Sequence, residues 1–228
     1  MNNNFEVLEK NIDYSFQNKA LIIQAMTHSS NANERKINKT EDYERLEYLG
    51  DAVLELITSE YLYKKFPNKD EGFLTRTRAS YVCEYTLSSC ARELGYGDFV
   101  LLSKGERMTG GANRNSILCD LFEAVLGAIY LDGGMKPATK YVYDFLLKDI
   151  DKKSLFYDAK TNLQELIQKR NSGVLSYKII DEEGPEHDRV YTTEVYIDDK
   201  AIARGRGQSH KASEQMAAYE ALLTLKDE

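Results

Sequence analysis

The sequence predicts two domains, an all-α domain followed by a small α+β domain with the element order α-β-β-β-α. Up to residue 150, apolar residues recur at the three- and four-residue spacing of amphipathic helices. From residue 158, one helical pattern is followed by three alternating, strand-like segments and a second helical pattern. We therefore expect domains at residues 1–150 and 158–228, joined by a charged linker at residues 151–157.

Local patterns place the elements in order. In the first domain, helical spacing predicts helices at residues 5–12, 19–27, 44–66, 70–94, 117–131 and 136–150. An Asn-rich segment at residues 30–40 and a glycine-bearing segment at 95–111 are expected to be connections. In the second domain, we expect helices at 161–171 and 210–225 around strands at 174–181, 190–197 and 201–206.

Composition narrows the class of protein. The 228 residues are 42% hydrophobic and 29% charged, which is ordinary for a globular chain. No apolar run reaches the roughly 18 residues of a membrane-spanning helix, and the first residues do not resemble a signal peptide. We therefore expect a cytoplasmic protein without membrane contact. Its three cysteines lack C-x-x-C spacing and are expected to be reduced core residues.

An acidic stripe runs along the helix expected at residues 44–66. Four acids share an arc of roughly 80°: Glu44, Glu47, Asp51 and Glu55. Residues 41–60 contain seven acids and only one base, Arg45, so the stripe lacks the oppositely charged neighbours of an ordinary polar face. Either it is nevertheless a solvated face, or it binds a cation. Gly50, in mid-helix, costs about 1 kcal/mol relative to alanine and indicates that another group approaches the backbone closely.

The helix expected at residues 117–131 is apolar nearly all round and carries only two charges, Asp120 and Glu123. A buried carboxylate is costly unless it is paired with a base or bound to a metal. An arginine or lysine from elsewhere would satisfy the two acids. Alternatively, they join Glu47 and Asp51 in a cage of four carboxylates, and oxygen ligands of this kind favour Mg²⁺ or Mn²⁺.

These segments resemble the sequence blocks of the ribonuclease III family, the double-stranded-RNA endonucleases. Residues 44–54 are similar to the family's signature stretch, and residues 25–30, 70–76 and 118–131 are similar to its other blocks, in order and at matching separations. The resemblance implies Mg²⁺-dependent hydrolysis of both strands, leaving 5′-phosphates and short 3′ overhangs, in the processing of rRNA, mRNA and tRNA precursors. Mn²⁺ is expected to substitute, and no organic cofactor is expected.

The resemblance also implies a role for each acid. Asp51 and Glu123 are expected to lie closest to the attacking water. Glu47, Asp120 and Glu123 are expected to be direct metal ligands, with Asp51 in the same set. Since one such cage cuts one strand, cleavage of both strands implies a homodimer.

Other polar residues of the first domain have two interpretations each. Glu44 and Glu71 match family positions at the edge of the site near the subunit interface, although Glu71 is also an ordinary acid for a helix's first turn. Lys104, Arg107 and Arg114 form a basic segment that either contacts RNA phosphates or is an ordinary surface loop. His28, directly after an apolar helix, is expected to be a hydrogen-bonded structural residue.

Three segments of the second domain, at residues 161–165, 184–187 and 205–215, are similar to the RNA-contacting segments of the double-stranded-RNA-binding domain, which this domain therefore resembles. Duplex RNA hides its bases in a deep major groove, so such a domain contacts 2′-hydroxyls and phosphates. Because the net charge is −7, phosphate contacts must come from local basic patches. The residues expected to contact RNA are Gln164, Glu165, His187, Arg204, Arg206 and Lys211. His210 stands where the family usually has a second basic residue beside Lys211, which predicts weaker phosphate binding that strengthens as the pH falls.

Two other functions fit part of the pattern. A relative that had lost its carboxylates would be a pure double-stranded-RNA binder, but all matched acids are present. A metal-dependent phosphohydrolase acting on small substrates would not need residues 158–228.

Overall fold

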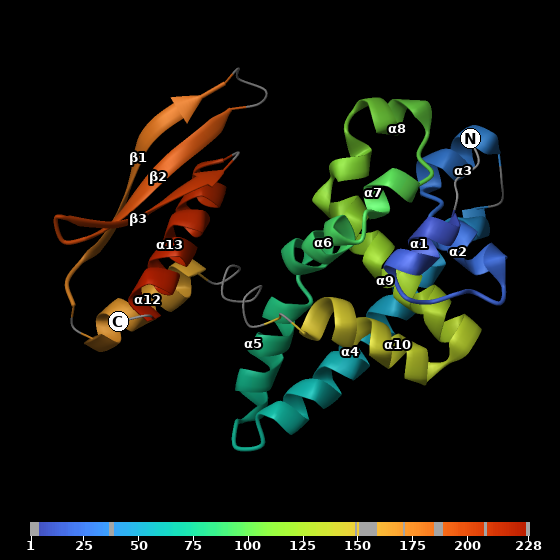
Figure 1. Cartoon of the computed structure of the whole chain (residues 1–228), viewed down its shortest axis with the longest axis horizontal. Helices are drawn as coiled ribbons and strands as arrows, with labels where there is room; N and C mark the ends of the chain where they lie inside the picture. Colours follow the sequence, from blue (N-terminus) through green and yellow to red (C-terminus); the bar gives the residue numbers. More distant parts are fainter. Residues whose placement is uncertain are drawn as a thin grey trace. The chain divides into compact units, whose positions relative to one another are not determined.

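The computed structural model describes residues 5–36, 39–148, 150, 159–170, 172–184, 189–207 and 209–226. The chain forms two compact units, Met1–Ile150 and Asp151–Glu228 (Figure 1). The expected linker at 151–157 lies outside the described residues. Among the residues that are described, no helix has the length and apolarity needed to cross a membrane.

The first unit is built around α4 (Glu44–Lys65) and α9 (Asn115–Gly133), which pack against each other (Figure 1). Ten residues of α9 are buried, so this helix forms the middle of the core. The other helical elements are α1 (Phe5–Asn11), α2 (Lys19–Ala25), α3 (Ser29–Arg35), η1 (Lys39–Glu41), α5 (Glu71–Tyr81), α6 (Glu84–Glu93), α7 (Tyr96–Phe99), α8 (Lys104–Met108), η2 (Gly111–Asn113), α10 (Met135–Val142) and the π-helical turn η3 (Tyr143–Leu147). The predicted all-α fold is confirmed.

Two glycines allow α4 and α9 to touch backbone to backbone. A Cβ atom on Gly50 would lie 1.8 Å from the carbonyl oxygen of Glu123, and one on Gly127 would lie 2.2 Å from that of Leu46. Because both clashes are with backbone, no side-chain rotation would relieve them. The prediction that Gly50 marks a close approach is confirmed, and the approaching backbone belongs to the second acidic helix.

The expected connections at residues 30–40 and 95–111 are wrong in part, because the first contains α3 and η1 and the second contains α7 and α8. The side chain of His28 accepts a hydrogen bond from the Ser30 amide at 3.0 Å and so begins α3. N-terminal helix amides are usually satisfied by Ser, Thr, Asp or Asn, which is why the sequence did not indicate this helix. The prediction that His28 is structural is confirmed.

The single helix expected at residues 70–94 is also wrong, since it is two helices, α5 and α6. Asp70 begins α5 by accepting a hydrogen bond from the Phe73 amide at 2.8 Å. The chain leaves the helical conformation at Cys83, which is extended with φ −74° and ψ 156°. The change of direction buries both Tyr81 before the break and Leu87 after it. Core packing therefore outweighs the continuous helical spacing.

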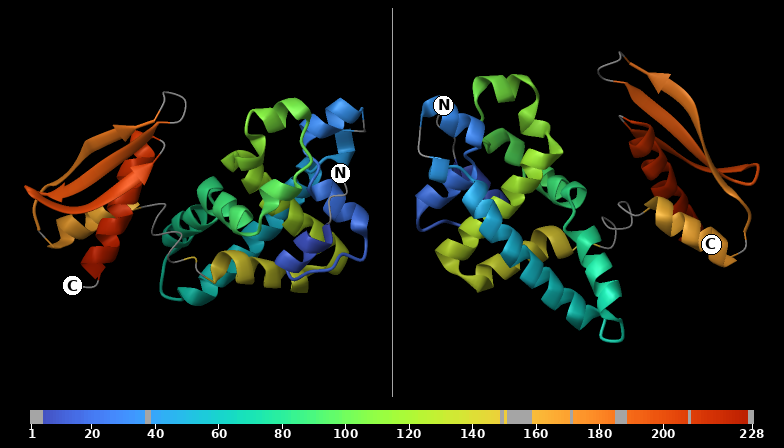
Figure 2. Two further views of the ribbon diagram at one scale, coloured as in Figure 1. Left: turned by 45° about the horizontal axis from the view of Figure 1, so that its top comes forward. Right: turned by 180° about the vertical axis from the view of Figure 1, so that it is seen from behind.

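The second unit is a three-stranded antiparallel sheet with two helices on one face (Figures 1 and 2). Its elements are α12 (Ala159–Arg170), β1 (Leu175–Glu183), β2 (Val190–Ile197), β3 (Lys200–Gly207) and α13 (His210–Lys226), and the strand order is β1-β2-β3. Leu163, Val195 and Leu222 are among the residues that join sheet and helices in one core. The predicted α-β-β-β-α order is confirmed.

Glycines also bring β3 against α13. A Cβ on Gly205 would lie 2.1 Å from the amide nitrogen of Ala217, and one on Gly207 would lie 2.5 Å from that of Ser213. Both glycines therefore face α13. Since successive residues of a strand point to opposite faces, Arg204 and Arg206 point to the other face of the sheet.

Candidate active site

The contact between α4 and α9 gathers four carboxylates. Glu47 and Asp51 are one turn apart on α4, on either side of Gly50, and Gly50 touches the backbone of Glu123 on α9. Asp120 lies one turn before Glu123 on the same helix. The two pairs therefore meet at the junction of the helices.

Burial and mutual repulsion change the acidity of these groups. Burial, and then the charges of Asp51, Glu47 and Asp120, raise the pKa of Glu123 to about 8. Burial, followed by Asp120, Glu44 and Asp51 among the nearby acids, raises the pKa of Glu47 to about 7. The pKa of Asp120 is also raised, again mainly by burial. In each case, burial and the neighbouring negative charges disfavour the ionised form of the carboxylate.

No lysine or arginine pairs with these acids within the part of the chain that the structure describes. None of its salt bridges involves Glu47, Asp51, Asp120 or Glu123. The alternative in which arginine or lysine satisfies the acids of α9 is therefore not met by any described residue. Across the same residues, no three His, Cys, Asp or Glu side chains converge closely enough to form a metal site without adjustment. Like charges repel, so carboxylates without a cation are expected to spread apart.

Tyr43, which sequence reasoning missed, contacts one of the four acids. Its hydroxyl donates a hydrogen bond to Oδ2 of Asp120 at 2.9 Å, and this bond opposes the effect of burial on the pKa of Asp120. Tyr43 stands at the position before α4 where Ser, Thr, Asp or Asn would ordinarily cap the helix, and its side chain makes no capping bond. A tyrosine at a position that usually holds a capping residue was the only sign in the sequence that Tyr43 has another role.

The two acids expected at the edge of the site lie apart from each other. Glu44 is exposed in the first turn of α4, close enough for its charge to raise the pKa of Glu47. Glu71 is exposed in the first turn of α5 and accepts a hydrogen bond from Thr75 at 2.7 Å. Glu55, the last acid of the stripe, forms a salt bridge with Arg78 at 3.1 Å. The stripe on α4 is therefore neutralised at Glu55 and open around Glu47.

The basic segment beyond α7 is partly engaged in local contacts. Arg114 forms a 2.6 Å salt bridge with Glu106, and Arg107 donates to the carbonyl oxygen of Val100 at 2.5 Å. Lys104 is exposed, and its ammonium group has no bonded partner among the described residues. The expected phosphate contact of this segment stays a prediction, with Lys104 as its most available cation.

The residues expected to contact RNA divide between two faces of the second unit. Gln164 and Glu165 are exposed on α12, and Lys211 is exposed in the first turn of α13, on the helical face. A 2.6 Å salt bridge between Lys160 and Glu214 links these two helices. His187 lies outside the described residues.

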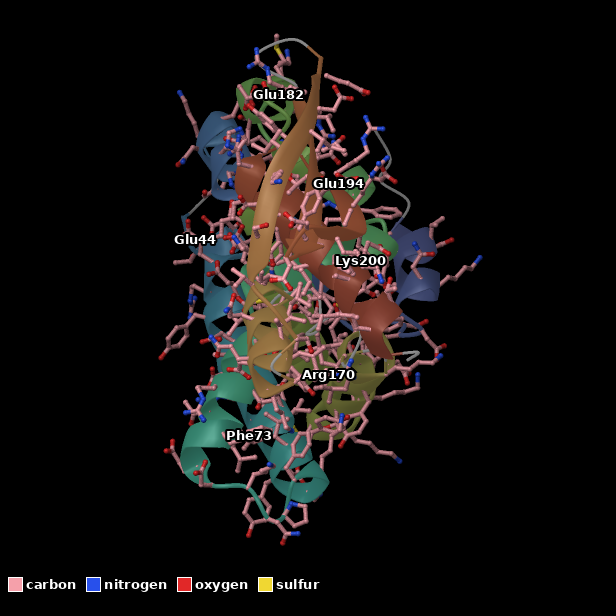
Figure 3. The ribbon with its side chains drawn as sticks, turned by 90° about the vertical axis from the view of Figure 1, so that its left-hand side faces the viewer. Glu44, Phe73, Arg170, Glu182, Glu194 and Lys200 are labelled. Carbon is pink, nitrogen blue, oxygen red and sulfur yellow. The ribbon has the colours of Figure 1, made fainter. Side chains whose placement is uncertain are left out.

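Arg204 and Arg206 lie instead on the outer face of the sheet. Arg204 forms a salt bridge with Glu194 at 2.5 Å, and Arg206 forms one with Glu183 at 2.5 Å (Figure 3, where Glu194 is labelled). Both arginines thus have acidic partners and point away from the face that carries Lys211. The structure does not bring them together with Lys211, because the alternation along β3 separates them.

Comparisons with known proteins agree with both units. Residues 18–150 match the family model described as ribonuclease-III-like, and residues 159–225 match the double-stranded RNA binding motif. Ribonuclease 3 of Halalkalibacterium halodurans is 47% identical over 97% of this chain and 85% of its own length. Ribonuclease 3 of Shouchella clausii is 46% identical over 92% of this chain and 82% of its own length. The chain belongs to the ribonuclease III family.

Membership of the ribonuclease III family makes the chain an endoribonuclease of double-stranded RNA, with a helical nuclease unit and an RNA-binding unit. Among solved structures, the nuclease domain of ribonuclease III from Campylobacter jejuni is 40% identical with a TM-score of 0.60, covering 65% of this chain and 99% of that domain. The Campylobacter jejuni domain has a region involved in dimer formation.

Proposed function

We propose that the chain is a Mg²⁺-dependent enzyme that hydrolyses both strands of double-stranded RNA and leaves 5′-phosphates with short 3′ overhangs. The main support is the set of four carboxylates on α4 and α9 that form no salt bridge with any described lysine or arginine. With the pKa of Glu47 at about 7 and that of Glu123 at about 8, the site gains from any positive charge that enters it. A proton or a metal ion would supply this positive charge, but only a metal ion would leave the carboxylates ionised.

The donor set fits a hard divalent cation. Mg²⁺ binds carboxylate oxygens and keeps several of its waters, and Mn²⁺ accepts the same ligands. We assign Glu47, Asp120 and Glu123 as ligands, with Asp51 in the same set. The bound ion would lower the pKa of a water and offset negative charge on the phosphate. Asp51 and Glu123 would orient that water toward the phosphorus, and no organic cofactor is needed.

We further propose that two copies pair through an exposed apolar face of α4. This stripe consists of Tyr48, Leu56 and Tyr63, which are 81%, 56% and 74% exposed and share one side of the helix. Large side chains exposed in a row typically mark an interface. The stripe runs beside the acidic one, so a two-fold partner would place two equivalent sites next to the interface, one for each RNA strand. The dimer-forming region of the Campylobacter jejuni domain supports this proposal.

The RNA would lie against α12 and the N-terminus of α13. Gln164 and Glu165 offer hydrogen bonds to 2′-hydroxyls, and Lys211 offers a cation at a helix end whose amides also favour phosphate. His187 belongs to this proposal, whereas Arg204 and Arg206 are withdrawn from it because they face the opposite side of the sheet. We propose that the enzyme acts in the cytoplasm on precursors of rRNA, mRNA and tRNA.

The test is cleavage of labelled duplex RNA, single-stranded RNA and duplex DNA, with and without Mg²⁺. We expect the parent chain to cut only duplex RNA and only with Mg²⁺. Glu123→Ala should abolish cutting and keep duplex binding in Ca²⁺, whose larger coordination shell does not suit catalysis. Glu60→Ala is the matched control, because Glu60 is an exposed acid of α4 that pairs with Lys64 and is not one of the four carboxylates. Loss of binding together with cutting in a folded Glu123→Ala chain would refute the proposal, as would Mg²⁺-independent cleavage.

A further inference from the structure

We propose that Tyr43 is a positioning residue for the metal site, where its hydroxyl holds one carboxylate oxygen of Asp120 so that the other oxygen is presented to the cation. This inference rests on the proposed function, since it concerns a ligand of the proposed metal. It adds a residue that lies outside the set of acids.

The hydrogen bond is well placed for such a role. The hydroxyl of Tyr43 donates to Oδ2 of Asp120 at 2.9 Å, and Tyr43 is only 3% exposed. A buried hydroxyl has little water to compete with its partner, so the bond is expected to persist. It joins the residue before α4 to the acid of α9 across 77 positions of sequence.

Tyr43 is itself held on two sides. Its amide donates to the carbonyl oxygen of Thr27 at 2.9 Å, and its ring packs edge-on against the ring of His28 with 5.5 Å between centroids. His28 is fixed in turn by Ser30, whose amide donates to its Nδ1 at 3.0 Å. The Ser30 hydroxyl oxygen accepts from the Ser103 amide at 3.1 Å. The hydroxyl of Tyr43 therefore has a defined position before any ion arrives.

The other proposed ligands lack this support. Within the described residues, none of Glu47, Asp51 and Glu123 has a side-chain hydrogen bond, whereas Asp120 has one to Tyr43. A carboxylate with one oxygen engaged cannot rotate freely, and its remaining oxygen points in a fixed direction. Groups that orient a ligand in this way typically contribute about 10–100-fold to metal affinity or activity. Asp120 is thus the ligand that is oriented before an ion binds, and the other proposed ligands would complete the site around it.

The test compares Tyr43→Phe with the parent chain. The substitution removes the hydroxyl and keeps the ring against His28. Tyr141→Phe is the matched control, because it removes a buried hydroxyl that bonds to Tyr96 at 2.6 Å elsewhere in the core. Three quantities are measured: Mn²⁺ binding, from the electron paramagnetic resonance signal of the free ion; the Mg²⁺ concentration that gives half-maximal cleavage; and duplex affinity without metal.

For Tyr43→Phe we expect the Mn²⁺ dissociation constant and the half-maximal Mg²⁺ concentration to rise by at least about tenfold, with duplex affinity unchanged. Tyr141→Phe should leave the Mn²⁺ dissociation constant and the half-maximal Mg²⁺ concentration equal to those of the parent. In an Asp120→Ala background, Tyr43→Phe should have no further effect on Mn²⁺ binding. The inference is overturned if Tyr43→Phe binds Mn²⁺ like the parent, or if it weakens binding equally in the Asp120→Ala background. A parent chain that neither binds Mn²⁺ nor depends on Mg²⁺ would refute the proposed function itself.

Discussion

Replacing Gly50 by alanine should separate the two acidic helices. The added Cβ would lie 1.8 Å from the carbonyl oxygen of Glu123, whereas real Cβ contacts are essentially never shorter than 3.0 Å, so α4 and α9 must move apart by the difference, about 1.2 Å. Overpacking a core in this way costs about 1–3 kcal/mol of stability. Alanine recovers about 1 kcal/mol through its higher helix propensity, which leaves a net loss of up to about 2 kcal/mol.

The effect on catalysis should be larger than the effect on stability. A displacement of about 1 Å among catalytic groups costs on the order of 100-fold in rate, equivalent to nearly 3 kcal/mol of activation free energy. Because Glu47 and Asp51 flank Gly50 on α4, the shift moves them away from Asp120 and Glu123 on α9. We therefore expect a folded Gly50→Ala protein that has lost most of its cleavage activity.

Urea unfolding followed by circular dichroism, together with single-turnover cleavage in saturating Mg²⁺, checks this expectation. Gly105→Ala is the matched control, because a Cβ on Gly105 of α8 would meet no atom within 4 Å. That variant should be as stable as the parent or slightly more stable. Parent-like activity in Gly50→Ala would refute the argument that this backbone contact sets the spacing of the acids.

Three further predictions concern the interface, the acids and the RNA surface. Tyr48→Asp puts a charge on the exposed stripe of α4 and should sediment as a monomer near 26.1 kDa, whereas the parent is expected to sediment as a dimer; a variant that stays dimeric would place the interface elsewhere. In metal-free protein, the free energy of unfolding should fall as the pH rises from about 5 to about 8, because the folded chain keeps protons on Glu47 and Glu123 that the unfolded chain has already released. Urea titrations across this pH range check it, and an equally steep fall in Glu123→Gln would contradict the assignment. Lys211→Ala should flatten the slope of log affinity against log salt for duplex RNA by about 0.7–0.9, while Arg204→Ala leaves it nearly unchanged; equal changes would return Arg204 to the RNA surface.

The acidic helices could be predicted because their signals are local. The 3.6-residue period of α4 and α9, the excess of acids over bases around Glu47, and the cost of Gly50 in mid-helix are all visible within a few turns of sequence. The bond from Tyr43 to Asp120 could not be predicted in the same way. Its partners lie 77 positions apart, and no pattern in the sequence connects the tyrosine before α4 to this particular acid.

Other differences between the predicted and the observed structure arose where a tertiary contact outweighed a local sequence pattern. The break at Cys83 has no sequence signal, because both flanking helices keep helical spacing and only burial of Tyr81 and Leu87 requires the turn. The placement of Arg204 and Arg206 was predictable in principle. The prediction grouped Arg204 and Arg206 with Lys211 on one RNA-binding surface, whereas the two-residue period of a strand puts these arginines on the face opposite to Gly205.

The backbone contact between Gly50 and Glu123 also has a consequence for the rate of folding. The two residues are more than seventy positions apart, so a large loop must close before the helices can dock, at a cost in chain entropy. Docking also brings together four carboxylates that repel one another until a cation is present. Salt screens such repulsion, so folding of the first unit should accelerate as ionic strength rises, and a metal ion that binds the docked helices should slow their separation.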